Sequence, residues 1–386
     1  MRSKLSGFGG MLGGGMVFVL LISLMVLGVQ AQFPVPREQA VVTETDTNFA
    51  NFDTATTFIP RGTQWGSGWH QVANEWDWYI NYATGDTIFW RTTGWEYSDD
   101  NMQLTWHVRP GVFWNDGEPY TAHDHVFTLK TLMADPGLVG ANHVENVVSA
   151  VAVDDFTVLI TFKQPDYRFH HKFRMWGGIT VVAEHTWEDQ NPREFRNWPP
   201  VETGPYVLHG LFRDLGMFVW ERNPDYWARE VFGVFPGPKY YIARMAPPPD
   251  LDLAEYIQGN VDLPLPHIFT IQMIRAAERR ADHVVTAPFM DAVSQGICSF
   301  NTAKAPLDDP EFRWAIQYLV NRDKHARVYP MAEESFPTMW PWPDYGSLDK
   351  FEFSEIIDKY GPRLRYDPAE AARILDRLGF RRGPDG

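Results

Sequence analysis

The chain has 386 residues, of which 44% are hydrophobic, 15% aromatic and 22% charged. This length allows two or three domains, and the composition is that of a folded protein rather than a disordered one. The formal net charge of −15 argues against a nucleic-acid partner, because binding phosphates requires a basic face. The one cysteine, Cys298, excludes an intrachain disulfide and a cysteine-based structural zinc site.

The N-terminus has the features of a secretory signal peptide. A positively charged start is followed by an apolar stretch over residues 16–27 and by Val-Gln-Ala at 29–31, which suits a signal peptidase. We expect residues 1–31 to be removed, although the apolar region is just long enough for an uncleaved membrane anchor. The next residue is Gln32 rather than cysteine, so we expect no lipid anchor and a periplasmic or extracellular mature protein.

Most of the predicted strands lie in the first two thirds of the chain. In residues 103–109 the apolar Leu104, Trp106 and Val108 alternate with polar residues, which is the pattern of a half-buried strand. A turn at 82–86 predicts a hairpin. The other predicted strands are 40–45, 148–153, 157–162, 204–208, 217–221 and 297–300.

Helices are predicted from capping residues and apolar periodicity. Thr121 and Asp124 form a capping-box pair ahead of an apolar face made by residues 126, 129, 132 and 133. Asp367 opens another helix, which Gly379 ends. The remaining predicted helices are 167–176, 179–187, 252–258 and 310–320, the last with Phe312, Ala315, Ile316 and Leu319 on one face.

The sequence offers no motif of enzymatic chemistry. It lacks G-x-S-x-G, G-x-x-x-x-G-K-[ST] and H-E-x-x-H. His123 and His125 do not share a helical face, so solvated histidines are a better interpretation than metal ligands. The acidic pairs at 99–100 and 308–309 resemble turn residues more than catalytic carboxylates. We therefore predict no enzyme, no catalytic residue, no metal and no cofactor.

The sixteen tryptophans are more than a core of this size usually requires. Indole rings offer flat, rigid contact area with a polar handle, which suits the binding of sugars or peptides. Core packing is the simpler interpretation for any single tryptophan, but we predict that at least one or two line a ligand cleft. The candidates are Trp65, Trp69, Trp76, Trp78, Trp176, Trp340 and Trp342.

Residues 106–124, W-H-V-R-P-G-V-F-W-N-D-G-E-P-Y-T-A-H-D, resemble the signature of the bacterial extracellular solute-binding proteins of family 5, the oligopeptide, dipeptide and nickel type. Members of this family serve ABC importers. Four further blocks are similar to the family and occur in its order, so that the resemblance spans about residues 40–386. These blocks are 203–206 with 221–227, 258–262, 299–302 with 306–316, and 367–380.

The resemblance implies an α/β fold of two lobes that close on a ligand, the large type II variant of the periplasmic-binding-protein fold. Lobe I is expected over 32–287, with an inserted subdomain near 62–168, and lobe II over 288–386. Family members continue further, so we expect the sequence to be truncated within lobe II. The acidic residue that binds a peptide's amino group in the family would then lie beyond it, and it is assigned to no position here.

The implied function is the capture of a solute by a monomer and its delivery to an ABC permease in the inner membrane. Oligopeptides are the primary expectation for the ligand. An oligosaccharide stays open, because some family members stack sugars on indoles and residues 65–95 are rich in aromatics. A nickel complex held by His123 and His125 is less favoured. An exported hydrolase would need two carboxylates across a cleft, and the sequence nominates no such pair.

Overall fold

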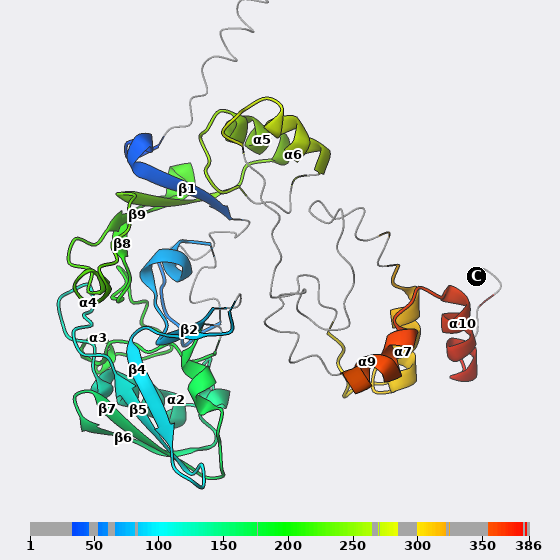
Figure 1. Cartoon of the computed structure of the whole chain (residues 1–386), viewed down its shortest axis with the longest axis horizontal. Helices are drawn as coiled ribbons and strands as arrows, with labels where there is room; N and C mark the ends of the chain where they lie inside the picture. The colour runs from blue at the N-terminus through cyan, green and yellow to red at the C-terminus, as the bar shows by residue number, and fades with distance from the viewer. Residues whose placement is uncertain are drawn as a thin grey trace, which may run out of the picture.

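The computed structural model describes residues 33–45, 53–60, 66–81, 84–175, 177–264, 269, 271–284, 299–321, 324, 354–380 and 383. Three β-sheets lie together, and a group of helices near the C-terminal end of the chain lies to one side of them (Figure 1). These helices are α7 (Pro310–Leu319), α9 (Ser354–Tyr360) and α10 (Pro368–Arg377).

The first sheet has four strands in the order β1 (Ala40–Thr45), β10 (Tyr240–Met245), β9 (Met217–Arg222) and β8 (Tyr206–Phe212). β1 runs parallel to β10, and the other pairs are antiparallel. Alternate residues of β9 point to opposite faces. Val219 joins one apolar cluster, and Phe218 and Trp220 join another. Both faces of this sheet are therefore covered, as expected of a central sheet.

The second sheet is antiparallel, in the order β4 (Thr92–Tyr97), β5 (Gln103–Val108), β7 (Thr157–Phe162) and β6 (Val147–Asp154). Leu104, Trp106 and Val108 are buried, which confirms the predicted alternation. The small third sheet is a hairpin of β2 (Trp78–Ile80) and β3 (Thr87–Phe89), as the turn at 82–86 predicts.

Helix α2 (Ala122–Ala134) covers the second sheet at β6 and β7. Its capping box is formed: Thr121 Oγ1 accepts from His123 N at 3.2 Å, and Asp124 Oδ2 accepts from Thr121 N at 2.7 Å. Leu129 and Leu132 are buried, whereas Met133 is 37% exposed. Met133 lies on the same side of the helix as Leu129, four residues earlier, but it is in the last turn before the helix ends at Ala134.

The remaining elements are short. They are η1 (Arg37–Gln39), η2 (Trp69–Ala73), η3 (Ala141–His143), η4 (Phe169–Phe173), α3 (Glu184–Trp187), η5 (Arg213–Leu215), α4 (Ala228–Phe232), α5 (Pro249–Ile257), α6 (Ile271–Glu278) and η8 (Gly361–Arg363). The predicted helix at 252–258 corresponds to α5. Among the described residues, no helix has both the length and the apolar character needed to cross a bilayer.

Helices α7 and α10 form an apolar core of their own. Ala315 and Tyr318 of α7 pack with Ala371 and Ile374 of α10. Leu319, which the sequence placed on the apolar face, is 49% exposed, and Tyr318 completes the buried stripe instead. The predicted strand at 297–300 falls partly outside the described residues, and the lobe and subdomain boundaries stay predictions.

The backbones of two distant segments meet closely at Gly204. Its amide donates to the Ala73 carbonyl at 2.8 Å, and a Cβ on Gly204 would lie 2.1 Å from that oxygen. We expect Gly204→Ala to lower the free energy of unfolding by about 1–3 kcal/mol, the usual cost of overpacking. Urea unfolding followed by tryptophan fluorescence measures the change.

Gly237→Ala is the matched control, because a Cβ at Gly237 would meet nothing within 4 Å. Its effect should stay within about 0.5 kcal/mol, as for an ordinary surface substitution. Equal effects of the two substitutions would contradict the close approach at Gly204.

Candidate functional site

Trp69, the first candidate that the structure describes, lies inside the protein. Its side chain is on η2 and is 2% exposed. The indole Nε1 donates to Glu202 Oε1 at 2.9 Å, and the ring belongs to the cluster that contains Phe218 and Trp220. In this conformation the indole therefore has its polar atom paired and its ring covered by the chain itself.

Trp76 and Trp78 are also buried, with exposed fractions of 7% and 2%. Trp78 Nε1 donates to the carbonyl of His170 at 2.9 Å, and its ring centre lies 5.1 Å from that of Trp95. Trp78 belongs to the core of the second sheet, so it does not share an apolar cluster with Trp69. The other candidates, Trp65, Trp176, Trp340 and Trp342, lie outside the described residues, and the ligand role of all seven stays a prediction.

Beside these tryptophans lies Glu75, a fully buried carboxylate with four hydrogen-bond donors. Oε1 accepts from Trp90 Nε1 at 2.8 Å and from Tyr226 Oη at 2.5 Å. Oε2 accepts from Trp227 Nε1 at 2.9 Å and from Thr203 Oγ1 at 3.0 Å. Burial raises the pKa of Glu75, because these donors offset only part of the cost of removing the charge from water.

Asp77, two residues further along the chain, is the centre of a second group of hydrogen bonds in this network. Its side chain accepts from Arg91 Nε at 3.0 Å, Tyr120 Oη at 2.6 Å and His125 Nε2 at 2.9 Å. Burial alone would raise the pKa of Asp77, but the adjacent His125 and Arg91 outweigh it and hold the pKa below its usual value. Arg91 also donates to Thr203 Oγ1 at 3.2 Å, which joins the Asp77 and Glu75 halves.

This network explains what the two acids and their partners do. Every oxygen of Glu75 and Asp77 accepts a hydrogen bond from this chain, so the carboxylates hold segments together rather than offer a free group to a ligand. Nearby, burial raises the pKa of Glu202 to about 8, although Trp69 donates to it. No motif in the sequence pointed to these acids. The sequence did contain one indication, because Glu75 and Asp77 alternate with tryptophans in the stretch N-E-W-D-W.

The histidine pair proposed for a metal complex is divided by the structure. His125 is buried against Asp77, whereas His123 is exposed and lies 3.6 Å from Asp155. Among the residues that the structure describes, no group of three or more histidine, cysteine or acidic side chains is placed to hold a metal ion.

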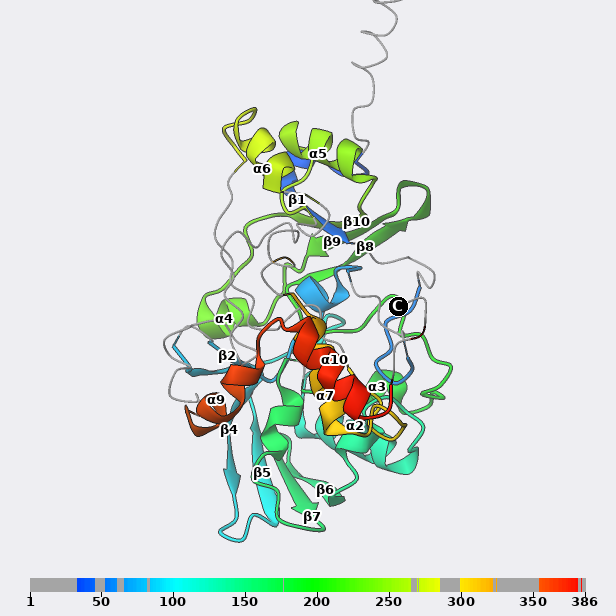
Figure 2. The ribbon, with the colours of Figure 1, turned by 90° about the vertical axis from the view of Figure 1, so that its right-hand side faces the viewer.

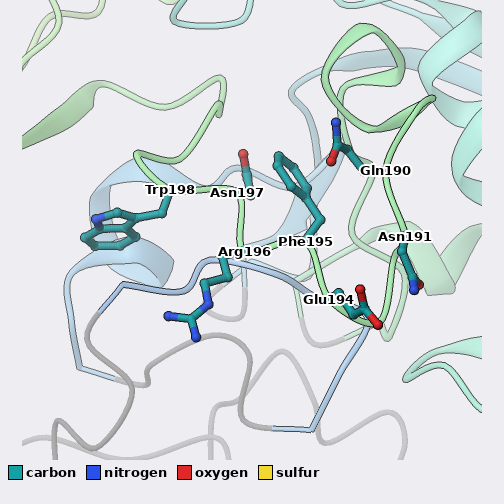
Figure 3. A pocket seen from close by; sticks show the side chains of 7 residues that line it. All are labelled: Gln190, Asn191, Glu194, Phe195, Arg196, Asn197 and Trp198. Carbon is teal, nitrogen blue, oxygen red and sulfur yellow. The ribbon is translucent and has the colours of Figure 1, made fainter.

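A surface pocket of about 390 Å³ lies on the segment before β8, at the small end of the range for ligand pockets. Figure 3 shows Trp198 at the left of the view and Gln190 and Asn191 at the right, with Arg196 between them. Arg196 Nη1 donates to Asp53 at 2.9 Å. The pocket is lined by Gln190, Asn191, Glu194, Phe195, Arg196, Asn197 and Trp198. None of the three described candidates, Trp69, Trp76 and Trp78, lines it.

The chain belongs to the bacterial extracellular solute-binding proteins of family 5, because the profile described as the middle region of that family matches residues 89–386. It is 35% identical over 297 residues to Protein XP55 of Streptomyces lividans, covering 75% of this chain and 49% of that protein. It is 25% identical over 315 residues to the dipeptide-binding protein of Escherichia coli, covering 75% and 54%. The chain spans about half the length of the curated relatives it matches.

The fold of this chain is also found in solved structures of periplasmic binding proteins. The mannohexaose-bound periplasmic oligopeptide-binding protein of an oligopeptide ABC transporter from Thermotoga maritima superposes with a TM-score of 0.71 at 24% identity. The match covers 91% of this chain and 64% of that one. The predicted family and the predicted α/β fold of periplasmic binding proteins are both confirmed.

The Asp77–Arg91 pair is predicted to be essential for stability, because both side chains are at most 1% exposed. Asp77→Ala should lower the free energy of unfolding by about 3–5 kcal/mol, since it leaves a buried guanidinium without its counter-charge. Arg193→Ala breaks an exposed pair with Asp135 and should cost less than about 1 kcal/mol. Denaturant unfolding of both variants checks this, and similar losses would contradict it.

Proposed function

We propose that this chain is the substrate-binding component of an ABC importer, which captures a solute between two lobes and delivers it to a permease. The observation that carries this proposal is membership of the solute-binding family across residues 89–386. The separate cores of the sheets and of the α7–α10 group are consistent with two lobes. Such a protein needs no covalent chemistry, so the proposal includes no enzymatic activity.

Oligopeptides are the proposed ligands. The names of the dipeptide-binding relative from Escherichia coli and of the oligopeptide-binding protein from Thermotoga maritima support this class. The mannohexaose in the second protein supports an oligosaccharide as the alternative. A nickel complex is less favoured, because His125 is already engaged by Asp77.

The seven candidate tryptophans remain our proposal for the aromatic walls of the cleft. Trp69, Trp76 and Trp78 would need to be uncovered in another conformation to touch a ligand, since each is at most 7% exposed here. Trp65, Trp176, Trp340 and Trp342 are therefore the first to test.

The proposed mechanism is a ligand-driven shift from an open to a closed arrangement of the lobes. A ligand moves this equilibrium only by its preference for the closed state, and a change from 1:99 to 99:1 requires about 5.5 kcal/mol. We further propose that residues 1–31 direct export and are then removed, and that the mature protein is a monomer outside the inner membrane.

A ligand screen by thermal shift tests the proposed function, using the protein expressed from its whole gene. Di- to pentapeptides should raise the melting temperature, because a ligand at 100 times its Kd stabilises the folded state by about 2.7 kcal/mol. Manno- and cello-oligosaccharides form the second arm. A shift with sugars alone would replace the peptide proposal, and the absence of any shift with both classes would contradict solute capture.

Single alanine substitutions separate binding tryptophans from core tryptophans. Trp340→Ala or Trp342→Ala should weaken ligand affinity roughly two- to tenfold, the worth of about 0.5–1.5 kcal/mol for an aromatic contact. Trp78→Ala should instead lower the unliganded stability by about 3–5 kcal/mol. Isothermal titration measures the affinity of each variant, and denaturant unfolding measures its stability. Unchanged affinity in all four variants at 65, 176, 340 and 342 would contradict the proposed walls.

A further inference from the structure

A second buried ionic cluster lies where the parallel strands β1 and β10 end beside helix α5. Arg244 of β10 donates from Nε and Nη2 to Glu44 Oε1 of β1, at 2.9 and 2.6 Å. Arg244 also pairs with Glu255 of α5, and its Nη2 lies 3.8 Å from Asp252 Oδ1. The side chains of Glu44 and Asp252 are both 0% exposed.

The charges of this cluster do not balance. Three carboxyl groups, those of Glu44, Asp252 and Glu255, face the single guanidinium of Arg244. Within the part of the chain that the structure describes, Glu44 Oε2 and both carboxyl oxygens of Asp252 are buried without a hydrogen-bond donor. A buried carboxylate without donors carries a large desolvation penalty, which the protein avoids if the group binds a proton.

We propose that Glu44 and Asp252 hold one proton between them at neutral pH, with Asp252 as the protonated partner that donates to Glu44 Oε2. One proton supplies the missing donor and removes one of the excess charges. When the proton is lost to solvent, two carboxylates repel each other inside the protein, and α5 is less firmly held to the ends of β1 and β10.

The electrostatics of the surroundings agree with this assignment. Burial, followed by the adjacent Glu44, raises the pKa of Asp252 to about 8, although Arg244 acts in the opposite direction. The charged groups that face Asp252 are Glu44 from β1, Arg244 from β10 and Glu255 from α5 itself. Helix α6 packs on α5 through an apolar cluster that contains Leu253.

The place of this pair in the fold gives it a consequence for the whole molecule. Helices α5 and α6 are the last described helices before residues 285–298, beyond which the chain reaches α7 (Figure 2). The shared proton therefore holds helix α5 to the first sheet. Helices α5 and α6 are followed along the chain by the residues that lead to the α7–α10 group. This inference holds for any ligand class and does not depend on the proposed function.

The pH dependence has a definite sign. In the unfolded chain an aspartate has a pKa of about 4. Between that value and about 8, the folded protein holds a proton that the unfolded chain has released. Stability therefore falls as pH rises through this window, and the unfolding constant rises about tenfold per pH unit from this group before levelling above pH 8.

The decisive comparison uses Asp252→Asn, which keeps the shape and the donor of the protonated carboxyl but cannot titrate. Asp250→Asn is the matched control, because Asp250 is an exposed residue of the same helix. Unfolding constants are measured by urea titration at half-unit steps from pH 5 to 9. The unfolding constant of the wild type divided by that of Asp252→Asn should rise about tenfold per pH unit up to about pH 8. The unfolding constant of Asp250→Asn should change with pH as that of the wild type does.

Infrared spectroscopy then reads the proton directly. At pH 6 the spectrum of the wild type minus that of Asp252→Asn should contain the carbonyl stretch of one protonated carboxyl. This band should also disappear from the wild type above about pH 8. Glu202→Gln is recorded as well, because the Glu202 carboxyl has a raised pKa and adds its own band.

Two outcomes would overturn the inference. The first is an infrared difference at pH 6 that contains no protonated carboxyl, together with the same pH slope in the wild type and Asp252→Asn. The second is failure of Asp252→Asn to fold, because the neutral isostere of the proposed state should be accepted without strain. Glu44→Gln should shift the titration of Asp252 to lower pH, since it removes the neighbouring charge.

Discussion

Carboxylates that are cut off from water must find their hydrogen-bond donors within the chain, and this constraint organises the first part of the molecule. Glu75 takes donors from Trp90, Thr203, Tyr226 and Trp227, so one side chain binds three segments that are far apart in sequence. Asp77 does the same for the residue before β4, through Arg91, and for α2, through His125. Because each acid is satisfied only when all its partners are in place, the network favours a single arrangement of the sheets around it.

Features set by near neighbours could be read from the sequence, whereas this network could not. The capping box of Thr121 and Asp124 and the alternation around Trp106 depend on residues a few positions apart, and both were predicted. The partners Glu75 and Trp227 are 152 positions apart, and no local pattern links them. The tryptophan count suggested ligand contacts, but the indole nitrogens of Trp69 and Trp78 bind Glu202 and a backbone carbonyl. A tryptophan that supplies a buried donor and one that lines a cleft look the same in sequence.

The two ionic clusters show how the neighbouring groups decide the state of a buried acid. Asp77 has Arg91 and His125 beside it, and its pKa falls below the usual value despite burial. Asp252 shares Arg244 with two other carboxyl groups, and its pKa rises. Burial disfavours the charge in both places, so the different outcome comes from the partners alone. The cluster at Asp252 can therefore respond to pH in the neutral range.

These features bear on the proposed closure of two lobes around a ligand. Closure as a rigid-body motion requires each lobe to keep its internal packing while the connection between them changes. The network around Glu75 and Asp77 supplies that rigidity in the part of the chain built on the sheets. The cluster at Glu44 and Asp252 lies instead beside the helices from which the chain leaves this part. A proton-dependent contact at that place would alter how firmly α5 is held to β1 and β10, while leaving the sheets themselves unchanged.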